Sequence, residues 1–251
     1  MDIPALARLS ATRLADFLLP PACLLCEAPV GEARTLCPDC WRGLHFLSAP
    51  LCACCGFPFP YEMGEGALCA ACAARPPAYD RARAVLAYDD VSRHLATRLK
   101  FSDRQEGVPA FGQWLARAGR VLLEGPVIIA PVPLHRRRLI ARRYNQAALL
   151  ARALARATGK TLAVDLLIRT RHTPPQIGLT AAGRRRNVSH AFAVRPRWRA
   201  LMGKVHVVLV DDVLTTGATV EACARVLKRA GARQVDVLTL ARVVSERKLP
   251  I

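Results

Sequence analysis

The second half of the chain alternates between short apolar runs and longer amphipathic segments. "VIIAP" (127–131), "LAVDLLI" (162–168), "VHVVLV" (205–210) and "VDVLTLA" (235–241) are rich in aliphatic and β-branched residues. Runs of this length and composition are typical of strands that are buried on both faces of a parallel sheet. The pattern therefore predicts four parallel strands.

Helical periodicity fills the intervals between these runs. Residues 144–159 and 219–232 repeat apolar positions at helical spacing, and Gly159 and Gly231 are expected to end the two helices. A strand–helix–strand order of this kind predicts an α/β fold with a doubly wound, Rossmann-like parallel sheet. Its ligands are expected to bind beyond the carboxyl ends of the strands.

Three more elements are expected between the first half and these strands. Residues 84–90 predict an additional antiparallel strand, and residues 91–100 and 107–123 predict two helices. A Pro-containing junction, "ARPPAYDRA" (74–82), separates this region from a cysteine-rich segment. We expect two domains, 1–78 and 79–251, with the boundary near residue 78.

The first 20 residues have the spacing of an amphipathic helix that ends before Pro20. Arg8, Arg13 and Asp16 interrupt the apolar core that a signal peptide would need, and no run is long enough to span a bilayer. The helix is expected to pack on its own protein. The chain is expected to be soluble and cytoplasmic, without membrane contact.

Nine of the ten cysteines lie before residue 73, and eight of them form pairs with two intervening residues. This spacing lets both thiolates of a tight turn face one point, and two such turns complete the tetrahedral cage that Zn²⁺ accepts. Neighbouring pairs close the shortest loops, which gives the following sets: Cys23, Cys26, Cys37 and Cys40 around one ion, and Cys52, Cys55, Cys69 and Cys72 around the other. Cys54 and Cys223 are expected to be packing residues.

Other interpretations of the cysteines compete with zinc. Interleaved pairing of the four turns is possible, and four cysteines also suit an iron–sulfur cluster. A disulfide framework belongs to secreted chains, and the sequence shows no export signal. Because protein ligands fill every position of each cage, we expect two structural zinc ions with no open position for substrate.

Charge is distributed unevenly between the two parts. Of 37 Lys/Arg and 19 Asp/Glu, residues 1–78 hold five and seven, so the formal charge of that part is −2 and that of residues 79–251 is +20. A surplus of this size predicts an anionic partner, either a phosphorylated small molecule or nucleic acid.

The stretch "VVLVDDVLTTGAT" (207–219) carries the most specific chemistry in the sequence. Small hydroxyl-bearing residues around Gly217 lie where a helix is expected to begin. The start of a helix offers N–H groups and the positive end of its dipole to a phosphate. Asp211 and Asp212 repel phosphate, so they are suited to sugar hydroxyls or to Mg²⁺. A phosphate beside a diol indicates ribose 5-phosphate.

These residues resemble the signature of type I phosphoribosyltransferases, which bind phosphoribosyl pyrophosphate with Mg²⁺. The resemblance implies that Asp211 and Asp212 hold the ribose hydroxyls. It also implies that the loop formed by Thr215, Thr216, Gly217, Ala218 and Thr219 holds the 5-phosphate.

Over nearly its full length the sequence is similar to the ComF family, in which a double zinc ribbon precedes a phosphoribosyltransferase domain. Beyond the main motif, the similarity rests on "LKFSDR" (99–104), "APVPLHRRRLIARRYNQA" (130–147) and "TRHTPPQIGLTAAGRRRNVSHAF" (170–192). Arg143 departs from the family pattern, which usually has a glycine at this position. The resemblance assigns Arg138, Arg142 and Asn145 to the pyrophosphate, and it places a flexible lid at residues 169–187.

The ComF resemblance also implies a link to competence and DNA uptake. The function expected from it is binding of phosphoribosyl pyrophosphate with Mg²⁺, with phosphoribosyl transfer as the reaction if one occurs. The alternative is a non-catalytic protein that binds single-stranded DNA through the basic runs "HRRRLIARR" (135–143), "GRRR" (183–186) and "RPRWR" (195–199), with Trp198 stacking on a base. A helicase-like competence protein is a further possible partner.

Overall fold

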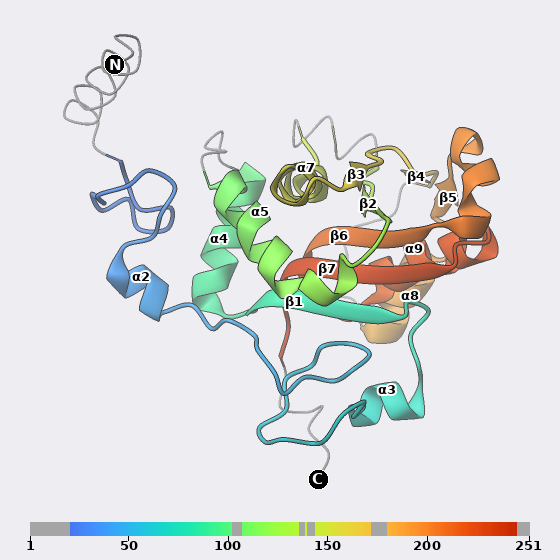
Figure 1. Ribbon diagram of the computed structural model, residues 1–251, viewed down its shortest axis with the longest axis horizontal. Helices are drawn as coiled ribbons and strands as arrows, with labels where there is room; N and C mark the ends of the chain where they lie inside the picture. The colour runs from blue at the N-terminus through green and yellow to red at the C-terminus, as the bar shows by residue number, and fades with distance from the viewer. Residues whose placement is uncertain (1–20, 102–106, 136–138, 140–143, 172–179, 245–251) are drawn as a thin grey trace.

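A computed structural model describes residues 21–101, 107–135, 139, 144–171 and 180–244 (Figure 1). The amphipathic helix expected in the first 20 residues lies outside these ranges. The described residues form a central five-stranded sheet in the order β1-β7-β6-β2-β3, and every neighbouring pair is parallel. The strands are β1 (Arg81–Ala87), β2 (Val127–Pro131), β3 (Thr161–Leu162), β6 (His206–Leu214) and β7 (Gln234–Arg242).

Helices cover both faces of the sheet. One face carries α4 (Asp90–Phe101), α5 (Val108–Ala118) and α7 (Gln146–Thr158), and the other carries α9 (Ala218–Arg229). The remaining elements are α2 (Pro38–Arg42), α3 (Ala70–Ala74), α8 (Ala181–Val188), the 3-10 helices η1 (Arg120–Leu122) and η2 (Pro196–Lys204), and a small antiparallel sheet of β4 (Leu167–Arg169) and β5 (Phe192–Val194).

The alternation of side chains along β6 shows why both faces need cover. Val207 and Leu209 belong to the core on the α9 side, whereas Val208 and Val210 belong to the core beneath α5 and α7. All four are fully buried, because successive side chains of a strand point to opposite faces. The parallel α/β fold expected from the sequence is confirmed.

Two of the sequence-based predictions about strands are wrong. The strand expected at 84–90 as antiparallel is β1, which runs parallel to β7 at the edge of the sheet. The apolar content of a short run specifies burial and not direction, so the sequence pattern could not settle this point.

The run 162–168 does not form one strand of the main sheet. It divides into the end of β3 and the start of β4, with a turn at residues 164–165. The carboxylate of Asp165 accepts hydrogen bonds from Arg197 (2.5 Å) and from the indole of Trp198 (3.2 Å). The main sheet thus ends for this segment at Leu162, and contacts with Arg197 and Trp198 hold the turn that follows it.

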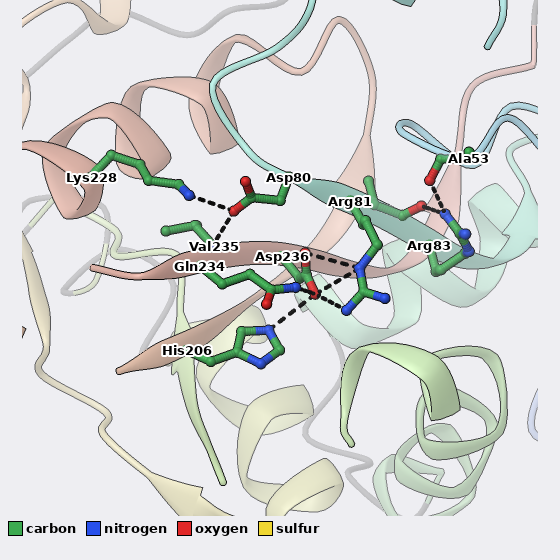
Figure 2. Close-up of polar contacts among 10 residues, drawn as sticks. Ala53, Asp80, Arg81, Arg83, His206, Lys228, Gln234, Val235 and Asp236 are labelled. Carbon is green, nitrogen blue, oxygen red and sulfur yellow. Dashed lines mark hydrogen bonds and ion pairs between the residues drawn. The ribbon is translucent and has the colours of Figure 1, made fainter. Parts of the chain in front are cut away.

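The amino ends of three strands are joined by one buried carboxylate, as Figure 2 shows. Asp236 of β7 is fully buried and accepts hydrogen bonds from Arg81 of β1 (2.7 Å) and from the amide of Gln234 (3.0 Å). Nε2 of His206, on β6, lies 3.0 Å from the same carboxylate. Burial raises the pKa of Asp236, but the contacts with His206 and Arg81 outweigh it and hold the pKa below its usual value.

Candidate functional site

Asp211 and Asp212 lie at the carboxyl edge of the sheet. Strand β2 ends opposite Val210, whereas β6 continues to Leu214 and remains paired with β7 on its other side. From Asp211 onward, the edge of β6 that was paired with β2 therefore has no neighbouring strand among the described residues. A crevice at such a point is where open α/β sheets bind ligands.

Local hydrogen bonds hold the acidic pair in an ordered turn of the backbone. The carboxylate of Asp211 accepts from the N–H of Asp212 (3.0 Å), and that of Asp212 accepts from the N–H of Val213 (2.8 Å). Both side chains are half-buried. Burial, and after it the charge of Asp211, raises the pKa of Cys223 in α9.

The hydroxyl-rich loop turns directly from β6 into α9. Gly217 caps the helix with φ of +79°, a backbone conformation that L side chains rarely adopt. The first helical residue is Ala218, so the positive end of the dipole of α9 is directed at the Thr215–Gly217 turn. The structure thus brings the predicted loop and the predicted acidic pair to consecutive positions at one edge of the sheet.

The predicted pyrophosphate residues are only partly described. Arg138 and Arg142 lie outside the described residues. Asn145 caps α7, because its side-chain oxygen accepts from the N–H of Ala147 (3.1 Å) and its amide nitrogen donates to the carbonyl of Val132 (3.0 Å). Asn145 thus fixes the start of α7 to the chain leaving β2, and its contact with pyrophosphate stays a prediction.

A cavity of about 730 Å³ opens beside this exit from β2. Pro133, Leu134 and His135 line one side of it, and Arg169, Thr170 and Arg195 of the β4–β5 region line another. Its volume falls in the range of small-molecule sites. Neither residue belongs to the phosphoribosyltransferase signature: Arg169 begins the segment expected as a lid, and Arg195 begins a basic run, so the sequence did not predict that they line a cavity.

The segment expected as a flexible lid contains a helix. Residues 172–179 lie outside the described residues, but α8 begins at Ala181, where Thr180 caps it by accepting from the N–H of Gly183 (3.1 Å). The backbone carbonyl of Asn187 accepts from Arg171 (3.2 Å), which joins the two ends of the segment.

The eight paired cysteines form two clusters with the expected membership. Cys23, Cys26, Cys37 and Cys40 make one, and Cys52, Cys55, Cys69 and Cys72 make the other, with all sulfur atoms of a cluster within 4.8 Å of one another. One contact in each cluster, Cys26–Cys37 and Cys55–Cys69, measures 3.6 Å. Four sulfurs about 2.3 Å from a central ion are separated by about this distance, so the clusters fit zinc.

Each cluster contains one thiol that is predisposed to the thiolate form that a metal needs. Hydrogen bonds from the thiols of Cys55 and Cys72 hold the pKa of Cys52 well below its usual value. Burial raises the pKa of Cys23, but backbone N–H groups, including that of Cys37 at 3.2 Å, lower it to about 6.

The two clusters differ in their surroundings. All four thiols of the second cluster are buried in the core that contains α9, whereas in the first cluster only Cys23 is buried and Cys26 is exposed. Cys54 is half-buried and lies outside both clusters, and Cys223 is fully buried against the sheet.

We expect two zinc ions per purified chain by metal analysis. Cys26→Ser and Cys72→Ser should each lose one ion, but Cys72→Ser should lower the melting temperature by more than about 10 °C and Cys26→Ser by less than about 5 °C. The difference arises because structural zinc contributes folding free energy, and only the second cluster lies within the main core. Equal losses of stability, or iron in place of zinc, would contradict this expectation.

The basic run "RPRWR" (195–199) is partly neutralised by contacts within the protein. Arg195 and Arg197 both form ion pairs with Asp165, at 2.9 and 2.5 Å. The indole N–H of Trp198 donates to the same carboxylate, and the guanidinium carbon of Arg197 lies 5.7 Å from the centre of the Trp198 ring. Trp198 is thus engaged within the protein, which weakens its assignment as a stacking surface.

No helix within the described ranges combines the length and apolar character needed to cross a membrane.

Comparison with protein families gives two matches that divide the chain. Residues 14–77 match the double zinc ribbon domain, and residues 146–251 match the phosphoribosyl transferase domain.

Three curated relatives match over most of the chain. "DNA utilization protein YhgH" of Escherichia coli O157:H7 is 34% identical over 90% of this chain and 99% of its own length. "Competence protein F" of Haemophilus influenzae is 30% identical, covering 88% and 96% of the two chains. "Competence protein ComFC" of Bacillus subtilis is 25% identical, covering 88% and 94%.

Proposed function

Because the chain belongs to the ComF family, which joins a double zinc ribbon to a phosphoribosyltransferase domain, we propose that it binds phosphoribosyl pyrophosphate with Mg²⁺. Asp211 and Asp212 hold the ribose hydroxyls in this proposal, and the loop from Thr215 to Thr219 holds the 5-phosphate. One observation carries the proposal: the acidic pair lies near the carboxyl end of β6, and the chain turns from there through residues 215–217 into the start of α9.

The donor set at this edge suits the two ends of a phosphorylated sugar. Carboxylates accept hydrogen bonds from vicinal hydroxyls, and backbone N–H groups at a helix start donate to phosphate oxygens. The αL conformation of Gly217 allows the backbone of the turn to approach the phosphate without a side chain between them.

Mg²⁺ fits the same edge because it prefers oxygen ligands and is usually held by one or two carboxylates plus substrate phosphates. Asp211 and Asp212 are the carboxylates that would help to hold it. When bound, Mg²⁺ supplies positive charge that stabilises a departing pyrophosphate. Arg138 and Arg142, the candidates from the sequence, would neutralise the same group. The cavity beside Pro133 is the place for an acceptor.

The binding proposal is tested by calorimetry on the full chain with phosphoribosyl pyrophosphate and Mg²⁺. We expect one site per chain with a dissociation constant of about 1 µM to 1 mM, the usual range for enzyme substrates. Omitting Mg²⁺ should weaken binding, and ribose 5-phosphate should compete. The absence of binding with Mg²⁺ present would refute the proposal, and release of pyrophosphate would extend it to catalysis.

We also propose a role in DNA handling, because two of the relatives are named for competence and one for DNA utilization. A helicase-like partner and single-stranded DNA are the proposed partners. One structural observation favours DNA: Trp41 and Phe46 are 49% and 39% exposed and form an aromatic cluster with Trp114. Exposed aromatic rings offer stacking surfaces to unpaired bases.

The DNA proposal is tested with a labelled oligothymidine at increasing salt. We expect affinity to fall steeply with salt and to drop several-fold in Trp41→Ala, since stacking contributes about 1–3 kcal/mol per base. Asp211→Asn should leave DNA binding unchanged if the two sites are separate. Negligible binding at low salt would eliminate this function.

A further inference from the structure

The second cysteine cluster lies against the loop to which we assign the 5-phosphate. The cluster and the loop line the same cavity of about 150 Å³. Cys55, Cys69 and Cys72 line it from the cluster, and Thr215, Thr216 and Gly217 line it from the loop. In Figure 1, α3 and the chain of this cluster lie below β1, beyond the edge of the sheet, and the four cysteines belong to the core that contains α9. The metal site and the loop are thus neighbours, although about 150 residues separate them in the sequence.

Arg242 joins the two directly. It is the last residue of β7, is only 3% exposed, and donates from a terminal guanidinium nitrogen to the carbonyl of Cys55. The guanidinium also lies over the ring of Phe57, 5.3 Å from its centre. In the sheet, Arg242 pairs with Leu214, the residue immediately before the phosphate loop, and the following N–H donates to the carbonyl of Leu214 (2.9 Å).

The second cluster is also fixed to β1 by close backbone contacts. The carbonyl of Cys54 accepts from the N–H of Ala82 (2.6 Å), and Arg83 donates to the carbonyl of Ala53 (3.2 Å; Figure 2). Gly56 has φ of +65°, and a Cβ there would lie 2.5 Å from the carbonyl oxygen of Ala82. This approach leaves no room for a side chain, so the metal-binding turn is seated directly on the strand.

The first cluster has no such relation to the loop. Residues of its segment pack with the other core: Leu44 lies with α4 and α5, and Trp41 contacts Trp114 with ring centres 5.8 Å apart. This core is on the opposite face of the sheet from α9. The two zinc sites therefore differ in position as well as in burial.

We propose that the second zinc site is a positioning element for the phosphate loop, that Arg242 is the positioning residue between them, and that the first site has no such role. The inference rests on the proposed binding of phosphoribosyl pyrophosphate. Zinc bound by the four cysteines would hold the Cys52–Cys55 turn closed, and this turn supplies the carbonyl that accepts from Arg242. If the zinc is lost, the buried guanidinium of Arg242 loses the carbonyl of Cys55 as its acceptor, at the strand end that precedes the loop. The loop then becomes less rigid, and a less rigid loop binds phosphate more weakly.

The first test compares two arginines that both contact the second metal-binding turn. Arg242→Gln should retain two zinc ions and weaken phosphoribosyl pyrophosphate binding about tenfold, which corresponds to 1.4 kcal/mol. Arg83→Gln, which loses a contact to Ala53 away from the loop, should keep affinity within about twofold. Unchanged affinity in Arg242→Gln, or equal weakening in both variants, would overturn the proposal.

The second test uses the unaltered protein and therefore does not depend on the folding of a variant. Zinc release to a zinc-selective chromophoric chelator is followed in excess Mg²⁺, with and without phosphoribosyl pyrophosphate. Coupling between two sites is reciprocal, so the ligand should slow release of the second zinc several-fold and leave the first unaffected. Equal rates with and without ligand, or protection of the exposed first site alone, would count against the coupling.

A measurement without ligand distinguishes failure of the binding proposal from failure of the positioning proposal. If the unaltered protein does not bind phosphoribosyl pyrophosphate, hydrogen exchange at the amides of residues 214–219 still reports on the contact. Faster exchange there in Arg242→Gln than in Arg83→Gln supports a positioning role. Identical exchange in the two variants refutes it.

Discussion

Replacing Asp211 and Asp212 together by asparagine is expected to weaken binding of phosphoribosyl pyrophosphate with Mg²⁺ by at least about 100-fold. Each hydrogen bond to a charged group contributes about 1.5–3 kcal/mol, so two such bonds account for about 3–6 kcal/mol. The asparagines keep the size of the side chains and can still accept from the neighbouring N–H groups seen in the structure. The loss should therefore appear in affinity, measured by calorimetry, and not in the melting temperature.

A matched control is available at the opposite edge of the sheet. Asp80 precedes β1 and contacts Lys228 (2.6 Å) and the N–H of Val235 (2.7 Å), far along the strands from the acidic pair. Asp80→Asn should leave affinity within about twofold. If it weakens binding as much as the double substitution does, the effect comes from overall charge and the assignment of Asp211 and Asp212 is wrong.

Asp236→Ala is expected to lower the free energy of unfolding by about 3–5 kcal/mol. Removing one partner from a buried ionic contact leaves the others uncompensated, and here the guanidinium of Arg81 and the ring of His206 both lose their acceptor. For a chain of this size the melting temperature should fall by about 6–20 °C. Differential scanning calorimetry measures the change, and metal analysis should still give two zinc ions per chain.

An exposed ion pair provides the control for this stability effect. Asp90 contacts Arg93 (3.0 Å) on the surface of α4, with both side chains largely exposed. Asp90→Ala should change stability by no more than about 1 kcal/mol. A comparably small effect of Asp236→Ala would show that the buried contacts contribute little.

The same carboxylate predicts a dependence of stability on acid. Because the pKa of Asp236 is lower in the folded chain than in the unfolded chain, its contribution is present above the unfolded value of about 4. That contribution is lost as the pH falls through the folded value. The stability difference between the unaltered protein and Asp236→Ala should therefore narrow below about pH 4, as measured by urea unfolding at a series of pH values.

The sequence predicted the strands β2, β6 and β7 because each contains a short run rich in aliphatic and β-branched residues, with helical periodicity between the runs. It did not predict the direction of β1, since burial on both faces looks the same in either orientation. It also merged β3 with β4, because the single aspartate in 162–168 was too weak a signal of a turn. Asp165 accepts hydrogen bonds from Arg197 and Trp198, which lie about 30 residues further along the chain. A local sequence pattern cannot predict partners at that distance.

The residues of the candidate site were more predictable than the residues that hold its loop in place. The acidic pair, the threonines and Gly217 all lie within residues 211–219. The cysteine spacing predicted two four-cysteine sites, and the preference for short loops favoured the memberships that the structure shows, although the sequence left interleaved pairing open. Arg242 was missed, although a lone arginine within "VDVLTLARVV" was a usable signal, because a charge in a buried strand needs a partner. That its partner is the carbonyl of Cys55, 187 residues away, depends on the assembled fold.

The strand order also has a consequence for biosynthesis. Strand β1 bonds within the sheet to β7 alone, and Arg81 meets Asp236 across 155 residues. On the ribosome, the cysteine turns can acquire metal as soon as they emerge, but β1 stays unpaired until β7, about 155 residues further along the chain, has been made. A nascent chain that stalls before β7 would thus carry its zinc and still expose a β edge, the kind of surface that chaperones shield and that aggregates when they do not.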